Sequence, residues 1–330
     1  MSVSASQSNP HDSYFRSVIS RPAEAASELT EVLPKTIAAY INWEKLELQS
    51  PAFVERHLRC SQADVVYRAS LDGHDTYAYI LIEHQSRTDR FMAVRLLGYM
   101  VNIWDHHRTT NPKSQLPMVI PLVVHSSHKG RRWNTHTELI ELFDLEPDMR
   151  TASGPYLPRF QFLLDDITAM DLDTLLNSGR TPLTKVMLAL HKIAPDMPHT
   201  DMLLPLVENL RAIGNSPTGK DDLDTIMYYI VSVSDIDTAD LQPIADLVGP
   251  RAQEAIMTTA DRLRAEGEAK GEAKGEAKGR AEALRQLLAV KFKSVPDRFT
   301  RRIDTATPEQ VRTWTARIID ATSPEEVFAP

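Results

Sequence analysis

Two carboxylates flank a segment that reads as a β-hairpin. Asp64 precedes one β-rich run, 65–71, and Glu83 closes a second, 77–83, beyond Gly73. If the two runs pair symmetrically about the turn, residues whose numbers add to 147 face each other, and Asp64 lies opposite Glu83. Their Cβ atoms would be roughly 4.5 to 5.5 Å apart, and like charges so placed destabilise a sheet. The spacing therefore predicts a cation held between the two carboxylates.

Gln85 extends this set of oxygen ligands. Because side chains alternate along a strand, Glu83 and Gln85 share one face, and Asp64 joins them whether the turn is Gly73-His74 or Asp72-Gly73. Carboxylate and amide oxygens are hard ligands that suit Mg²⁺ or Mn²⁺. Such an ion activates water and stabilises charge on a phosphoryl oxygen. The residues thus predict metal-assisted phosphate chemistry, with Asp64 and Glu83 as the metal ligands.

The elements after the hairpin predict a sheet that positions this set. Thr88 or Asp89 can cap a helix that runs to about His107, and the β-branched run 118–124 follows it. Strand, helix and strand form a βαβ unit, so the sheet is expected to be mixed, with helices packed on its faces. This is an α/β fold class.

A further strand is expected at 160–164. Asp165 and Asp166 follow it. They are expected to end the strand or cap the next helix, and a place in the metal site is the alternative. Nearer the start, a helix is expected from Pro22 with Ser20 as its cap.

The chain is expected to divide into five segments, and beyond about residue 172 the pattern becomes helical. The segments are a flexible arm (1–12), an α/β core (13–172), a helical extension (173–260), a repeat segment (261–280) and a small helical tail (281–330).

The repeat segment carries the unit Gly-Glu-Ala-Lys three times over 267–278. Each interior glycine costs a helix about 1 kcal/mol relative to alanine, and the i,i+4 pairs are like charges. The segment is expected to be a marginal helix or a flexible tether. Residues 267–279 either join two copies of the chain as a homo-oligomer or form a plain solvated linker.

Composition limits the function classes. At 330 residues with 42% hydrophobic residues, no apolar run near the ~20 residues of a membrane span and no signal-peptide pattern, the chain is expected in the cytoplasm without membrane contact. Cys60 is the single cysteine, so no internal disulfide forms. The net charge of -8 argues against nonspecific coating of nucleic acid. The stretch 84–136, however, holds eight Lys or Arg against two Asp, which suits a polyanion such as DNA, or forms a solvated basic face.

Several stretches carry a family resemblance. An acidic residue heading a hairpin and a Glu-x-Gln at the end of the next strand look like the PD-(D/E)XK nuclease core, with Gln85 where lysine is usual. The sequence around these residues closely resembles the Rpn family of recombination-promoting, transposase-like nucleases over about residues 11–260. The motifs that carry this resemblance are His11-Asp12-Ser13-Tyr14-Phe15-Arg16, Leu33-Pro34, Asp64-Val65-Val66-Tyr67-Arg68, Leu81-Ile82-Glu83-His84-Gln85-Ser86, Arg95-Leu96-Leu97-Gly98-Tyr99-Met100 and Leu116-Pro117-Met118-Val119-Ile120-Pro121-Leu122-Val123.

The resemblance implies a bacterial, Mg²⁺-dependent DNA endonuclease with a restriction-endonuclease-like mixed sheet and an α-helical C-terminal half. Asp64 and Glu83 would hold the metal, and Gln85 would orient water or the scissile phosphate. Glutamine cannot act as a cation, so Arg95 is expected to compensate. Arg95 and Tyr99 lie one helical turn apart, and a shared role at the helix interface is the alternative.

The resemblance also implies that a first-helix glutamate, namely Glu24, Glu28 or Glu31, assists the metal. His125 and His128 stand where the family pattern differs, and both are expected at the surface. Two other functions compete with the nuclease: a catalytically weak DNA-binding or regulatory protein on the same fold, and an oligomeric interaction protein.

Overall fold

The computed structural model describes residues 9–50, 65–71, 77–127, 129–293 and 295–329. The chain divides into two compact units, Met1–Thr259 and Ala260–Pro330. Within the described parts, no helix combines the length and hydropathy that crossing a bilayer requires.

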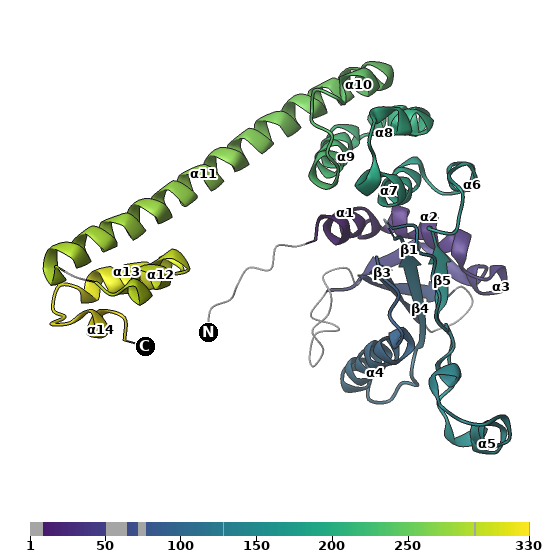
Figure 1. The fold of residues 1–330 in the computed structure, drawn as a ribbon. Coiled ribbons are helices and arrows are strands. Elements are labelled where there is room, and N and C mark those ends of the chain that lie inside the picture. Colours follow the sequence, from purple (N-terminus) through teal and green to yellow (C-terminus); the bar gives the residue numbers. More distant parts are fainter. Residues whose placement is uncertain (1–8, 51–64, 72–76, 128, 294, 330) are drawn as a thin grey trace. The chain divides into compact units, whose positions relative to one another are not determined.

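The first unit is built on a five-stranded mixed sheet in the order β1-β2-β3-β4-β5 (Figure 1). The first three strands are antiparallel neighbours, and β4 and β5 run parallel to β3. Their bounds are β1 Ile41–Leu48, β2 Val65–Leu71, β3 Tyr77–Gln85, β4 Met118–His125 and β5 Leu163–Asp166. The predicted mixed sheet is confirmed.

The predicted hairpin register is also confirmed for the described residues. Val65 pairs with Ile82, and the ladder continues to Ser70 opposite Tyr77, so each pair adds to 147. Helix α4 (Met92–Thr110) connects β3 to the parallel strand β4, as the βαβ pattern predicts.

Hydrophobic alternation divides the sheet into two packed faces. The odd-numbered β3 residues Tyr79 and Leu81 pack in one core cluster with Leu96 of α4. The even-numbered Ile80 and Ile82 pack in another with α1, α2 and α7, on the opposite side of the sheet (Figure 1). A side chain on β3 therefore faces α4 if its number is odd and the α1/α2/α7 layer if it is even.

Helices supply most of the remaining chain, and the expected helical C-terminal half is confirmed. The other helices of the first unit are α1 Pro10–Ile19, α2 Pro22–Val32, α3 Lys35–Ala38, α5 Pro147–Ser153, α6 Leu172–Leu176, α7 Pro182–Ile193, α8 Val207–Gly214, α9 Gly219–Val233 and α10 Gln242–Val248, with 3₁₀ turns at Leu139–Leu142, Gly154–Tyr156, Ala194–Asp196 and Thr200–Leu206.

Three expectations near the start were wrong. Helix α1 begins at Pro10, inside the segment expected to be a flexible arm, because Asn9 caps it by accepting from His11 N at 3.2 Å. Ser20 caps the end of α1 rather than the start of α2, whose N-cap is Arg21. No strand was expected at 41–48, where β1 lies.

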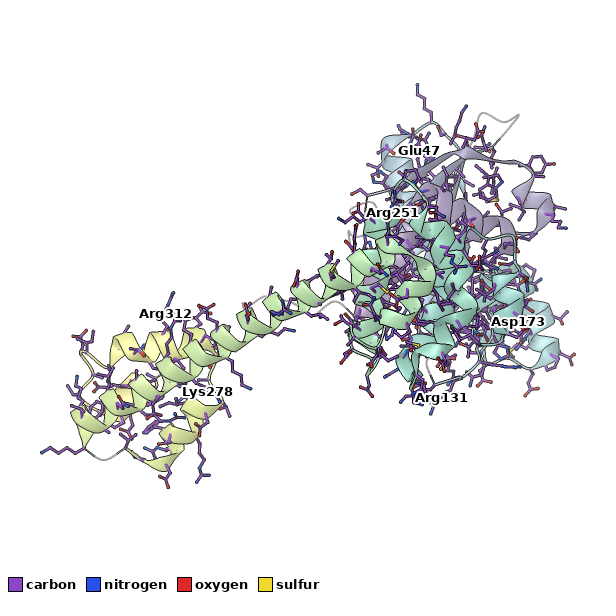
Figure 2. The ribbon with its side chains drawn as sticks, turned by 90° about the horizontal axis from the view of Figure 1, so that it is seen from above. Glu47, Arg131, Asp173, Arg251, Lys278 and Arg312 are labelled. Carbon is purple, nitrogen blue, oxygen red and sulfur yellow. The ribbon has the colours of Figure 1, made fainter. Side chains whose placement is uncertain are left out.

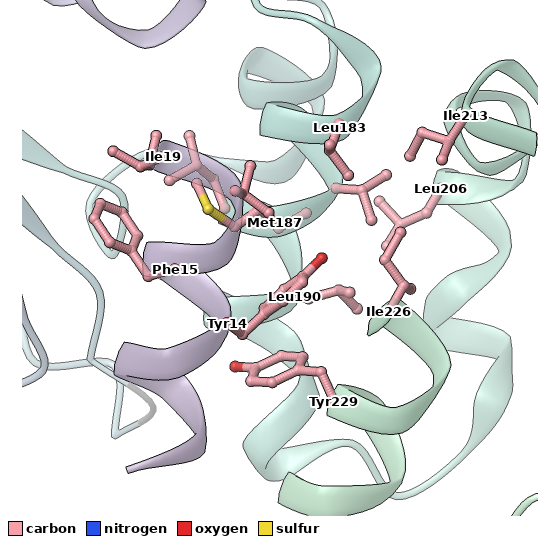
Figure 3. Close-up of a cluster of buried hydrophobic side chains, with 14 of the residues drawn as sticks. Tyr14, Phe15, Ile19, Leu183, Met187, Leu190, Leu206, Ile213, Ile226 and Tyr229 are labelled. Carbon is pink, nitrogen blue, oxygen red and sulfur yellow. The ribbon is translucent and has the colours of Figure 1, made fainter. Parts of the chain in front are cut away.

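Helix α1 is fixed by an aromatic cluster that it shares with α7 and α9 (Figure 3). Tyr14 of α1 stacks on Tyr229 of α9 with ring centroids 4.2 Å apart, and Leu190 of α7 lies beside them (Figure 3). These buried contacts tie the N-terminal helix to the helical extension.

Helix α11 spans Pro250–Phe292 and includes the whole repeat, so the helical alternative describes the segment. Its glycines at 267, 271, 275 and 279 have nothing within 4 Å of an added Cβ among the described residues. The repeat's charges are solvated, as Lys278 illustrates (Figure 2). Arg280 and Glu276 form an i,i+4 ion pair at 2.5 Å.

The second unit has its own small core. It packs the end of α11 against α12 (Asp297–Asp304), α13 (Pro308–Arg317) and α14 (Pro324–Val327) around Trp314 and Phe328. Thr307 caps α13 in a capping box with Gln310.

Candidate active site

Glu83 lies at the carboxyl end of β3, completely buried, on the face that α4 covers. Its Oε1 accepts from Gln85 Nε2 at 2.6 Å and from Arg95 Nη2 of α4 at 2.5 Å. Arg95 Nη1 donates in turn to Asp89 Oδ2 at 3.1 Å. The structure thus brings three of the sequence-predicted site residues, Glu83, Gln85 and Arg95, into direct contact.

The second oxygen of this carboxylate has no partner. Glu83 Oε2 is buried and makes no hydrogen bond with any described residue. A buried acceptor left without a donor costs roughly 1 to 3 kcal/mol, and more when it is charged. An open carboxylate oxygen beside the Gln85 amide is a donor set that fits a hard divalent cation.

Asp64, the predicted partner of Glu83, lies outside the described residues. The described ladder ends at Val65 opposite Ile82. Among the residues that the structure does describe, no group of three or more His, Cys, Asp or Glu is arranged to hold a metal ion. The pairing of Asp64 with Glu83 around a metal therefore stays a prediction.

The first-helix glutamates of α2 lie on the other face of the sheet. Glu28 Oε2 accepts from Arg180 Nε at 2.7 Å, and Arg180 Nη2 donates to Asp165 Oδ2 of β5 at 2.7 Å. Burial, together with the nearby charge of Asp165, raises the pKa of Glu28 to about 8. Glu24 accepts from Thr184 Oγ1 at 2.8 Å, and Glu31 accepts from the Gly179 amide at 3.1 Å. All three join α2 to α7 or to the segment directly before it, away from Glu83.

Asp165 and Asp166 of β5 have separate structural partners. Asp165 pairs with Arg180, whereas Asp166 Oδ2 accepts from the Trp133 amide at 2.8 Å and its Oδ1 from the Ala169 amide at 3.3 Å. Asp166 thus secures the turn after the strand, in agreement with the expectation that these residues end the strand.

His84, next to Glu83, projects to the opposite face and was not singled out by sequence reasoning as a site residue. Its Nδ1 lies 3.0 Å from Asp12 Oδ1 of α1, and its Nε2 lies 2.8 Å from Ser126 Oγ. Phe15 stacks on its ring at 4.7 Å between centroids. The sequence could have drawn attention to this pair, because Asp12 and His84 both lie in stretches that carry the family resemblance.

His125 at the end of β4 is fully buried, so the expectation of a surface position was wrong; His128 lies outside the described residues. The Nδ1 atom of His125 lies 2.9 Å from the Gln85 carbonyl, and its Nε2 atom lies 2.9 Å from the Arg131 carbonyl. It therefore joins the loop after β4 to the end of β3.

A pocket of about 560 Å³ opens beside these strand ends. It is lined by Ser86, Arg87, Thr88, His125, Ser127, Lys129, Arg131, Arg132 and Asn134. Four of its nine lining side chains are Lys or Arg. Basic residues of the stretch 84–136 therefore lie together at the end of the sheet that carries Glu83.

Comparison with known proteins assigns the chain to a family. The family described as "Putative transposase, YhgA-like" matches residues 9–220. The recombination-promoting nuclease RpnD of Escherichia coli O157:H7 is 28% identical over 260 residues, covering 78% of this chain and 94% of the relative. RpnA of Escherichia coli K12 is also 28% identical, covering 79% and 85%.

The similar proteins include one with a different description. RpnE of Escherichia coli K12, called an inactive recombination-promoting nuclease-like protein, is 27% identical, covering 79% of this chain and 83% of the relative. No solved structure gives a significant match. Since the matched family covers most of the chain, from α1 into α9, the chain belongs to the YhgA-like putative transposase family.

Proposed function

We propose that the chain is a DNA endonuclease that uses a divalent metal ion at the carboxyl end of β3. The observation that carries the proposal is the buried Glu83, whose Oε1 is held by Gln85 and Arg95 while its Oε2 lacks a partner. The names of RpnD and RpnA as recombination-promoting nucleases support the reaction class.

The fold proposal is a PD-(D/E)XK nuclease core. It is supported by the order of elements around the site: an antiparallel hairpin of β2 and β3, the crossover helix α4 and the parallel strand β4. In this arrangement Glu83-x-Gln85 occupies the end of the second hairpin strand, and in the sequence Asp64 directly precedes the first.

In the proposed mechanism Asp64 and Glu83 would hold Mg²⁺ or Mn²⁺. When bound, the ion supplies Lewis-acid stabilisation of the phosphodiester oxygen and lowers the pKa of a water molecule. Arg95 orients Glu83 through its hydrogen bond to Oε1 and places a positive charge beside it. Gln85 has its amide nitrogen committed to the same oxygen, so its amide carbonyl is the group that can orient water or phosphate.

A weakly active or inactive DNA-binding protein on the same fold is the second candidate. One specific observation favours it: Gln85 takes the position of a lysine and donates to Glu83, so it adds no positive charge for the departing oxygen. The description of RpnE as inactive shows that proteins this similar can lack activity.

A cleavage assay separates these candidates. Supercoiled and linear DNA are incubated with the wild type in Mg²⁺, in Mn²⁺ and in EDTA, and the same series is run with Glu83→Gln and Asp64→Ala. The proposal expects metal-dependent nicking by the wild type and at least a 100-fold loss in each variant, because each removes a metal ligand. Glu44→Gln, an exposed glutamate of β1, is the matched control.

Equal cleavage by wild type and Asp64→Ala would remove the nuclease assignment from this site. Metal-independent binding of DNA without cleavage would favour the second candidate.

A further inference from the structure

The segments that follow β3 and β4 carry a cluster of cations. The side chains of Arg87, Lys129, Arg131 and Arg132 are exposed and line one pocket. No ion pair or hydrogen bond joins any of the four to another side chain in the described parts of the chain. Like charges gathered without counter-charges repel, so the pocket favours an anionic occupant.

The backbone of the loop after β4 is held in place by buried side chains. Ser127 N donates to Thr168 Oγ1 at 2.7 Å, and Trp133 N donates to Asp166 Oδ2 at 2.8 Å. Between these two points the Arg131 carbonyl is bound by His125 Nε2 at 2.9 Å. A fixed backbone lowers the ordering cost of binding, because only the side chains remain to be immobilised.

Glycine is required at the bend of the loop. Gly130 has φ +61°, in the left-handed region, and its amide donates to the Ser127 carbonyl at 3.0 Å. This turn places Lys129 on one side of the bend and Arg131 on the other, and both line the pocket.

The Asp166 carboxylate lies beside the loop and accepts from two backbone amides. Lys192 of α7 is a further cation there and donates to the Thr168 carbonyl at 3.0 Å. Burial lowers the pKa of Lys192, the charges of Asp166 and Asp171 oppose this, and the charge of Arg132 adds to it. The described cations around the loop therefore outnumber these two carboxylates.

A second pocket continues the first. It has a volume of about 430 Å³ and shares Thr88 and Asn134 with the first pocket. It adds Arg90, His136 and Glu141, and the Glu141 carboxylate is paired with Arg150 at 2.8 Å. The two adjacent pockets, together called the groove, exceed what one phosphate needs and offer room for a DNA strand, which carries phosphates at regular intervals.

The groove begins where the candidate active site ends. Ser86 and Arg87 directly follow Gln85, and His125 pairs with Gln85 in the parallel ladder and lies 2.9 Å from its carbonyl. A nucleic-acid strand bound in this groove would therefore pass the end of β3, where Glu83 lies.

We infer that the groove lined by Arg87, Arg90, Lys129, Arg131 and Arg132 binds successive backbone phosphates of duplex DNA beside the Glu83 centre. The inference rests on the proposed function, since it identifies the groove as the substrate-binding surface of that site. Because the contacts are made to phosphates, binding depends on salt and little on base sequence.

The test measures binding without cleavage. A fluorescently labelled duplex is titrated with the full chain in EDTA, and the affinity is followed by anisotropy over about 50 to 200 mM salt. The variant Arg87→Ala/Arg131→Ala/Arg132→Ala is compared with Lys45→Ala/Arg108→Ala/Lys113→Ala, which removes the same charge from exposed positions outside the groove.

Each phosphate contact contributes about 0.9 to the slope of log affinity against log salt. If all three arginines contact phosphates, the groove variant shows a slope shallower by nearly three and binds about 500-fold more weakly at about 0.1 M salt. The control triple changes the affinity by less than about tenfold. Replacing the same three arginines by lysine retains most of the slope, which separates lost charge from lost folding.

Several outcomes overturn the inference: equal loss in the groove and control variants, a slope that changes by less than one, or salt-dependent binding of RNA with no binding of the DNA duplex. Tight binding of inorganic phosphate that DNA does not displace would also overturn it. If the wild type binds DNA through these arginines but never cleaves it, the groove assignment is kept and the nuclease assignment is rejected. If the groove variant binds and cleaves DNA like the wild type, the groove assignment is rejected and the nuclease assignment is kept.

Discussion

Replacement of Arg95 by methionine tests how the buried charge of Glu83 is held. The Glu83 carboxylate is 0% exposed and receives one neutral donor, Gln85, and one cationic donor, Arg95. Removing one partner of a fully buried ion pair costs about 3 to 5 kcal/mol. The Arg95 side chain is 32% exposed and also pairs with Asp89, so solvent screening reduces the expected loss to about 2 to 3 kcal/mol.

Urea unfolding measures this loss. In a Trp314→Phe background, the remaining tryptophans all report on the first unit. The double variant Glu83→Gln/Arg95→Met removes both charges and recovers most of the stability, which gives a coupling energy of about 2 kcal/mol. Arg108→Met is the control, because Arg108 is an exposed arginine of the same helix and should cost under about 0.5 kcal/mol.

Magnesium then distinguishes a metal ligand from a structural ion pair. A cation bound by Glu83 replaces the lost guanidinium, and an ion at 100 times its Kd stabilises the folded state by about 2.7 kcal/mol. Mg²⁺ should therefore stabilise Arg95→Met and have no effect on Glu83→Gln/Arg95→Met. A loss below about 1 kcal/mol in Arg95→Met would refute the assigned role of the pair, and equal stabilisation of all variants would place the ion away from Glu83.

Three further perturbations test other parts of the chain. In the folded chain the pKa of Glu28 is about 8, above its ordinary value of 4.5, so the folded state binds a proton that the unfolded state lacks between these values. The unfolding free energy of the wild type should thus fall as pH rises through this window, and Glu28→Gln should flatten the decline; an identical pH profile in urea melts would contradict this. Gly130→Ala, which forces alanine to φ +61°, should destabilise the first unit by about 1 kcal/mol, and no change in its urea midpoint would show that the loop tolerates the substitution. Gly271→Ala/Gly275→Ala should add about 2 kcal/mol of helix propensity to α11 and raise the 222 nm circular dichroism, and an unchanged spectrum would show that the repeat is already fully helical in solution.

The hairpin register was predictable because its information is local. The two runs alternate in hydrophobicity around Gly73, and a one-residue slip would move every buried side chain to the wrong face. Strand β1 lacks that clarity, because Glu44, Lys45 and Glu47 interrupt its apolar positions and its register shifts between Ile41 and Leu46.

The contacts across the sheet were only partly predictable. Glu83 and Gln85 share a face by strand periodicity, and the start of a crossover helix must pass near the end of the strand before it, which brings Arg95 within reach. The ion pair of Glu28 with Arg180 joins residues 152 positions apart. No local pattern specifies such a pair, so the α2 glutamates were expected at the metal and instead secure the opposite face.

His84 couples this opposite face to the candidate active site. It follows Glu83 directly, and its ring is held between Asp12 of α1 and Ser126 at the end of β4. Burial opposes ionisation of Asp12, but the hydrogen bond and charge of His84 outweigh it and lower the pKa of Asp12, so the carboxylate persists as a fixed acceptor. Because adjacent residues of a strand move together, we expect loss of this anchor to displace the Glu83 carboxylate. We therefore expect Asp12 and His84 to act as positioning residues for Glu83, because the two stretches of resemblance that contain them meet at the end of β3, on the face of the sheet opposite α4.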